Sequence, residues 1–223
     1  MSVALFTYPP NALFGRIIPK SKIYEHAAPN AALKALFVLQ VEQMVWQYKL
    51  ATETINLPTV AAVPEIQIFN ISLKTPELDE AVLRCIDQAI PLPIFFQLTY
   101  GEKIQIKAAY KRPSETDSSR WVTDCYFATE WQAIDSERQP LPLALDLGAL
   151  YELMLRPLLP IPPRAGETIK LHMERLTQIR VKQSEYRKIA ASLHKERQFN
   201  RKVALNSQLK TLQIALDKLQ HSE

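Results

Sequence analysis

The C-terminal part of this chain contains no residue that interrupts a helix. After Gly166, neither glycine nor proline occurs up to Glu223. These two residues disfavour helix interiors more than any others. The sequence therefore predicts one long helix, or two, over residues 167–220. The segment before it, residues 160–163, reads Pro-Ile-Pro-Pro and is typical of a stiff, extended connection.

We accordingly divide the chain into three parts. A core domain occupies residues 1–160, a proline-rich linker occupies residues 161–166, and a helical arm occupies residues 167–223. The hydrophobic share of 47% is sufficient for a sizeable core, and the charged share of 22% is typical of a folded chain.

The core domain shows the patterns of both strands and helices. Four segments have the length and the hydropathy of strands; they are residues 63–73, 94–100, 103–110 and 121–131. Gly101-Glu102 predicts a tight hairpin turn between the second and third of them. Apolar residues recur every three or four positions in three further segments. These predict helices over residues 31–50, 75–90 (with Thr75 as N-cap) and 145–159.

Together these elements predict an α+β fold. We expect a small antiparallel sheet of about four strands with packed helices on one side. Strand 63–73 is expected to join this sheet, and the helix that follows it to connect it to the other strands. A long basic C-terminal helix, or a helical hairpin, follows the sheet.

Charge is distributed unevenly between the two ends of the chain. Residues 164–223 hold 13 Lys and Arg against 6 Asp and Glu, which gives +7, and residues 1–163 hold 14 against 17, which gives −3; the net charge is +4. A basic segment attached to a slightly acidic core suggests nucleic acid or an acidic partner for the arm.

The cations of the arm fall on one side of the predicted helix. At about 100° per residue, six of them share an arc of about 140°; they are Arg180, Arg187, Lys188, Lys195, Arg201 and Lys202. Such a face suits the phosphates of nucleic acid, without sequence specificity. The alternative is an ordinary solvated face, because long exposed helices are commonly rich in Lys and Arg.

The end of the arm carries a second pattern, a seam of leucines at alternating spacings of four and three. Its members are Leu205, Leu209, Leu212, Leu216 and Leu219. Another apolar surface must cover this seam. Three possibilities remain open: the earlier part of the arm or the core, a second copy of the chain, or a partner protein.

Residue types exclude several kinds of chemistry. Only four glycines occur, so glycine-rich phosphate loops are excluded. Cys85 and Cys125 stand apart from each other and from the histidines, so we expect no metal and no cofactor. No signal peptide and no membrane span is predicted, and we expect a cytoplasmic protein.

A metal-dependent nuclease remains as an alternative. Glu65, Lys107 or Lys111, and Asp124 are strand residues of the types that such enzymes use. The Asp/Glu-x-Lys spacing of restriction-type sites does not occur on a predicted strand, and isolated charges on a sheet usually face solvent.

Segments along nearly the entire chain resemble one bacterial family. They are Ile18-Pro19-Lys20 with Tyr24, VEQMVWQYKL (41–50), TINL (54–57), EIQIF (65–69), Ile86-Asp87, Ala109-Tyr110-Lys111, LPLALDLGALYE (141–152) and QFNRKVALN (198–206). The pattern resembles the family named domain of unknown function 4391. The resemblance implies no catalytic residues. It implies an accessory role beside helicases, DNA methyltransferases and restriction-like genes in bacterial defence clusters.

Three functions follow as expectations. The first is a non-enzymatic accessory component of a restriction-modification or anti-phage defence system, which contacts nucleic acid or a partner subunit through the arm. That partner would be a helicase, a methyltransferase or another defence subunit. The second is a protein–protein adaptor or oligomerisation module that acts through the leucine seam. The third is an atypical metal-dependent nuclease.

Overall fold

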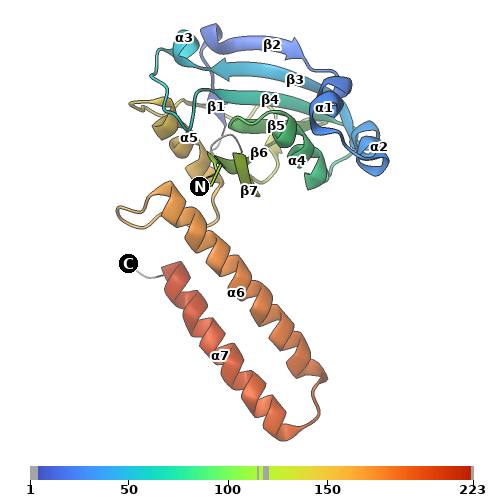
Figure 1. Cartoon of the computed structure of the whole chain (residues 1–223), viewed down its shortest axis with the longest axis vertical. Coiled ribbons are helices and arrows are strands. Elements are labelled where there is room, and N and C mark those ends of the chain that lie inside the picture. Colours follow the sequence, from blue (N-terminus) through green and yellow to red (C-terminus); the bar gives the residue numbers. More distant parts are fainter. Residues whose placement is uncertain (1–4, 115, 118–120, 222–223) are drawn as a thin grey trace. The chain divides into compact units, whose positions relative to one another are not determined.

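A mixed seven-stranded sheet forms the centre of the first of two compact units, Met1–Pro160 and Ile161–Glu223. The computed structural model describes residues 5–114, 116–117 and 121–221 (Figure 1). The sheet has the order β2-β3-β4-β5-β6-β7, and β8 pairs with β6. A separate two-stranded sheet joins β1 and β9.

The bounds of the strands are β1 Phe6–Thr7, β2 Leu13–Ile17, β3 Val41–Leu50, β4 Ile66–Leu73, β5 Ile94–Tyr100, β6 Lys103–Pro113, β7 Trp121–Ala128, β8 Gln132–Ala133 and β9 Gln139–Pro140. The bounds of the helices in the first unit are α1 Lys20–Ala27, α2 Ala31–Gln40, α3 Thr52–Ile55, α4 Glu80–Ala89 and α5 Leu147–Leu155, with short 3₁₀ turns at η1 Pro10–Ala12 and η2 Arg156–Leu158.

Neighbouring strands of the large sheet are antiparallel except β4 and β5, which are parallel. The crossover between these two strands contains α4, so strand 66–73 joins the sheet through the helix that follows it, as predicted. Gly101 has φ of 54° and makes the tight turn between β5 and β6, a conformation that glycine adopts without steric cost.

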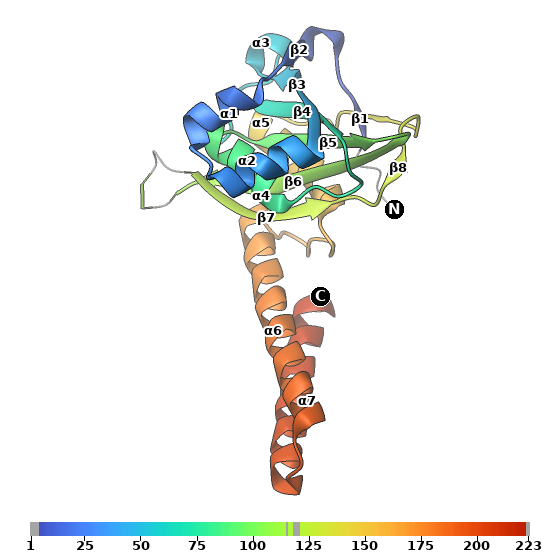
Figure 2. The ribbon, with the colours of Figure 1, turned by 90° about the vertical axis from the view of Figure 1, so that its right-hand side faces the viewer.

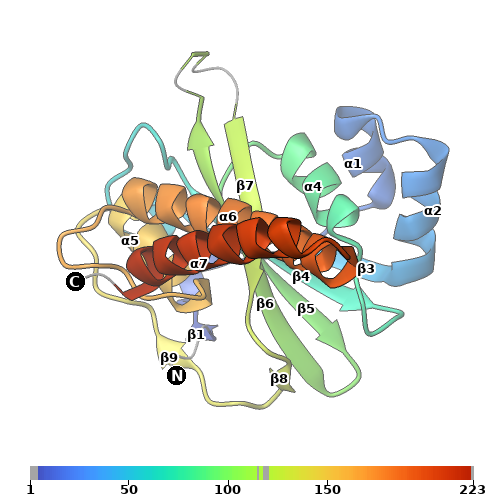
Figure 3. The same cartoon turned by 90° about the horizontal axis from the view of Figure 1, so that it is seen from below.

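Helices cover both faces of the sheet. Alternation along β5 places Phe96 in a core cluster with α1, α2 and α4, and places Phe95 on the other face, against Tyr151 of α5. Figures 2 and 3 show α5 on the opposite side of the strands from the other three helices. The α+β fold is therefore confirmed, but the sheet is larger than predicted and the helices are not confined to one side.

The predicted helix over residues 31–50 is correct only in its first half. Asn30 caps α2 by accepting a hydrogen bond from the backbone N–H of Leu33 at 2.9 Å, and the helix ends at Gln40. Residues 41–50 instead form β3, which pairs with β4 on one side and β2 on the other. The apolar spacing of this segment fits a helix as well. The segment forms a strand because it hydrogen-bonds to a neighbouring strand on each side.

The predicted start of the next helix is also wrong. Asp79, rather than Thr75, is the N-cap of α4, and its carboxylate accepts from the N–H of Ala81 at 2.8 Å. The hydroxyl of Thr75 donates to the carbonyl of Glu77 and holds a turn before the helix.

The second unit is a helical hairpin of α6 (Ile169–Lys195) and α7 (Phe199–His221), which run antiparallel and side by side (Figures 1 and 2). Of the two possibilities left open by the sequence, the structure therefore shows two helices. Glu196 ends α6, and its carboxylate accepts from the backbone N–H groups of Arg197 and Gln198, which turns the chain into α7. None of the described helices is both long enough and apolar enough to span a membrane.

Candidate nucleic-acid interface

The outer face of α6 carries four of the six predicted contact cations. These are Arg180, Arg187, Lys188 and Lys195, and all four are exposed. At about 100° per residue they occupy an arc of about 100°. Within this arc, from residue 177 to residue 195, no carboxylate occurs, and the positions between the cations hold the small residues Ser184 and Ala191. We call these four cations and the two small residues the basic face.

The opposite side of α6 faces α7. Ile179 is buried, and Tyr186 and Leu193 are half-buried, along one line of α6. The five leucines of the predicted seam provide apolar surface on α7: Leu212 and Leu216 are buried, and Leu205, Leu209 and Leu219 are half-buried. Of the three possible partners of the leucine seam, this structure contains the first: the seam packs within the arm, on α6.

The two remaining cations lie elsewhere. Arg201 and Lys202 belong to the first turn of α7, beyond the break at residues 196–198, and both are exposed. Arg201 lies 3.9 Å from the carboxylate of Glu196. The expectation of six cations along one continuous helix is therefore wrong, because the chain reverses direction after the fourth of them.

An ion pair and several hydrogen bonds hold the base of the hairpin. The guanidinium of Arg175 donates to both carboxylate oxygens of Glu167, at 2.7 and 2.8 Å, and also to the carbonyls of Pro162 and Leu219. These hydrogen bonds, with one from the backbone N–H of Arg164, lower the pKa of Glu167 to about 2. This anchor joins the first turns of α6 to the last turn of α7 and to the segment that precedes α6. Sequence reasoning missed it, because nothing local marks Arg175 as different from the exposed cations.

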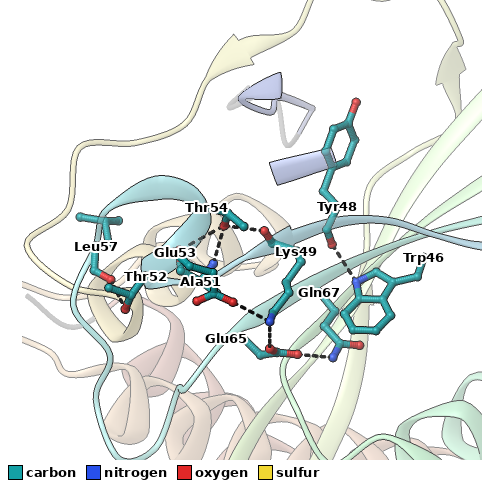
Figure 4. A network of polar contacts seen from close by, with 10 residues as sticks. All are labelled: Trp46, Tyr48, Lys49, Ala51, Thr52, Glu53, Thr54, Leu57, Glu65 and Gln67. Carbon is teal, nitrogen blue, oxygen red and sulfur yellow. Dashed lines mark hydrogen bonds and ion pairs between the residues drawn. The ribbon is translucent and has the colours of Figure 1, made fainter. Parts of the chain in front are cut away.

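A polar network lies at the end of the large sheet (Figure 4). The ammonium of Lys49 contacts the carboxylates of Glu53 at 2.6 Å and Glu65 at 3.3 Å. The side-chain amide of Gln67 donates to Glu65 at 2.5 Å. Glu65, one of the candidate nuclease residues, is thus ion-paired with Lys49, which it shares with Glu53.

The other nuclease candidates are not gathered around Glu65. Lys111 is 2% exposed, and its ammonium contacts Asp87 at 2.6 Å and the carbonyls of Ile90 and Leu92 at 2.8 and 2.6 Å. It closes the C-terminal end of α4 inside the core, so no substrate phosphate reaches it. Lys107 and Asp124 lie on β6 and β7, both half-buried. Among the described residues, no three His, Cys, Asp or Glu side chains form a group that could hold a metal ion.

Comparison with known proteins is consistent with the resemblance seen in the sequence. Among curated proteins and among solved structures, nothing matches this chain. Residues 6–216 of the 223 match the family described as "Domain of unknown function (DUF4391)". The match extends from β1 into the last turns of α7 and includes both compact units. The chain therefore belongs to the DUF4391 family.

Proposed function

We propose that this protein is a non-enzymatic accessory component of a bacterial DNA-directed defence system, located in the cytoplasm, which contacts nucleic-acid phosphates through the basic face of α6. The observation that carries the contact is the exposure of Arg180, Arg187, Lys188 and Lys195 along one arc of α6. The place in a defence system is based on the family resemblance.

The dimensions of the face suit a nucleic-acid backbone. An α-helix rises about 1.5 Å per residue, so Arg180 and Lys195 are about 22 Å apart along the axis. A duplex presents one phosphate charge per about 1.7 Å of its axis, and the four cations therefore meet several phosphates at once. Ser184 and Ala191 leave room for the backbone to approach between the long side chains. Since phosphates carry no sequence information, binding is expected to be independent of sequence.

The test is fluorescence anisotropy with two duplexes of unrelated sequence over a series of salt concentrations. The double variant Lys188→Glu/Lys195→Glu is expected to weaken both complexes equally and to reduce the slope of log K against log salt by about one per cation removed. The matched control is the double variant Arg197→Glu/Lys210→Glu, which makes the same change in net charge, because Arg197 and Lys210 are exposed cations outside the basic face. If the control weakens DNA binding as much as Lys188→Glu/Lys195→Glu does, the effect is one of net charge alone and the proposal is overturned.

A protein–protein adaptor is the second candidate. It is favoured by Phe199 and Val203, two apolar residues in the first turns of α7 that are 77% and 54% exposed. The partner would be another subunit of the same system, such as a helicase or methyltransferase. Co-purification and light scattering of the double variant Phe199→Ser/Val203→Ser test this candidate. Loss of a bound subunit supports it, loss of a homo-oligomer identifies a second copy as the occupant, and an unchanged mass contradicts it.

A further inference from the structure

The four cations of the basic face stand in two rows along α6. At about 100° per residue, Arg180 and Arg187 lie within about 20° of each other around the helix, and so do Lys188 and Lys195. We call these pairs the Arg row and the Lys row. The two rows are about 80° apart, and all four side chains are exposed. The basic face is therefore two parallel lines of charge rather than one.

The strip between the two rows holds only short side chains. Its members are Ser184 and Ala191, and both are exposed. The Arg and Lys side chains on either side are long, and they diverge from each other because the surface of a helix is convex. A partner that meets both rows at once must therefore be concave and must carry phosphates along two edges.

The second helix of the hairpin does not cover this strip. Ile179, Tyr186 and Leu193, which face α7, lie about 150° around the helix from the middle of the strip. The helix α7, which runs beside α6 (Figure 1), therefore packs behind the strip. Glu185 is exposed, and it lies about 60° beyond Lys188. Its negative charge disfavours phosphates beyond the Lys row and so limits them to the two rows.

The major groove of B-form DNA has the shape that this face requires. The groove is about 12 Å wide, and an α-helix with its side chains is about 10–12 Å across. Its two walls are the two sugar-phosphate backbones, one for each row. The minor groove, about 6 Å wide, is too narrow for a helix. The major groove of an RNA duplex is deep and narrow, and a single strand has only one backbone.

We propose that α6 docks in the major groove of B-form DNA, with the Arg row on one backbone, the Lys row on the other, and the strip towards the floor of the groove. This inference rests on the proposed contact between the basic face and phosphates, and it specifies which nucleic acid supplies them. Neither Ser184 nor Ala191 can make the bidentate hydrogen bonds that distinguish one base from another, so docking requires no particular sequence.

The test is fluorescence anisotropy of the full chain at one salt concentration, with four probes of matched length and base order. They are a DNA duplex, an RNA duplex, a DNA single strand, and a DNA duplex whose pyrimidines carry bulky uncharged groups at C5, which project into the major groove. The three duplexes carry the same number of phosphates, so they separate groove shape from charge. The DNA duplex is expected to bind about 10-fold more tightly than the RNA duplex or the modified duplex.

A substitution within the strip tests the same geometry from the side of the protein. Ser184→Trp places a large side chain between the rows, and it is expected to weaken the DNA duplex about 10-fold and to leave the single strand unchanged, because only the duplex must admit the strip into a groove. The matched control Ser207→Trp makes the same change at an exposed position of α7, and it should alter neither complex. Ala191→Trp repeats the test at a second position, and circular dichroism shows which variants keep the helical signal.

The proposal is overturned if the RNA duplex or the modified duplex binds as tightly as the DNA duplex, or if Ser184→Trp and Ala191→Trp bind the DNA duplex like the unaltered chain. The double variant Lys188→Glu/Lys195→Glu separates this result from failure of the proposed function. If the groove tests fail and the double variant still weakens binding, the basic face contacts phosphates without entering a groove. If the double variant changes nothing, the phosphate contact itself is wrong.

Discussion

The ammonium of Lys111 lies 2.6 Å from the carboxylate of Asp87, and the two side chains are 1% and 3% exposed. Tyr126 donates its hydroxyl to the second carboxylate oxygen. Burial lowers the pKa of Lys111 and raises that of Asp87, because both charges are removed from water, and each group partly offsets the shift of the other. The pair joins α4 to β6 within the core.

Breaking this pair is expected to be costly. Lys111→Met leaves the carboxylate of Asp87 buried without its cation, and we expect a loss of about 3–5 kcal/mol in the free energy of unfolding. Urea denaturation measures the change. Lys22→Met is the control, because Lys22 and Glu25 form an exposed pair, for which the expected loss is under about 1 kcal/mol. Similar values for the two variants would contradict a stabilising role for the buried pair.

Tyr151 fills an irregularity in the sheet. The register of β6 and β7 shifts between Ala109 and Lys111, and there the Tyr151 hydroxyl donates to the Ala109 carbonyl and accepts from the Lys111 N–H, both at 2.8 Å. Tyr151→Phe leaves two buried backbone groups without partners, so we expect a loss of about 1–3 kcal/mol and faster hydrogen exchange at the Lys111 amide. Tyr110→Phe, which alters the ring stacked on Tyr151, serves as the control and should leave that exchange rate unchanged.

The anchor of the hairpin predicts a specific acid sensitivity. Arg175 lowers the pKa of Glu167 from 4.5 to about 2. A carboxylate with a lowered pKa in the folded state contributes stability that is complete above its unfolded value and is lost as the pH falls through the folded value. We therefore expect the arm to lose stability between about pH 4.5 and pH 2. Thermal unfolding by circular dichroism across this range should show a shallower loss for Glu167→Gln, and Glu174→Gln on the exposed side of α6 should behave like the unaltered chain.

The leucines of α7 differ in burial, and their variants should differ accordingly. Leu216 is 6% exposed, whereas Leu205, near the turn, is half-buried. Leu216→Ala is expected to destabilise the hairpin by about 2–5 kcal/mol, since it removes buried methyl groups and leaves a cavity. Leu205→Ala should cost clearly less. Chemical denaturation followed by helical signal measures both. The reverse order would show that the seam near the turn is covered by something other than α6.

Local sequence patterns were sufficient wherever neighbours in the chain decide the structure. The lack of glycine and proline after Gly166 predicted helices there. Period-two alternation identified β4, and the length and hydropathy of residues 94–100 identified β5 with its correct bounds. The turn at Gly101 followed from residue type alone. These features depend on backbone freedom and on which side successive side chains point, and both properties are encoded within a few residues.

Tertiary structure decided what depends on partners far away in the chain. Residues 41–50 became a strand because β2 and β4 lie on either side of them, although their spacing also fits a helix. Lys111 became a buried cation because α4 places Asp87 opposite it. The apolar pocket lined by Ile23, Trp46 and Phe69 exists only where three strands and two helices meet. Whether a side chain is buried or paired depends on residues that are distant in the sequence. The periodicity of one segment does not indicate which distant segment will pack against it.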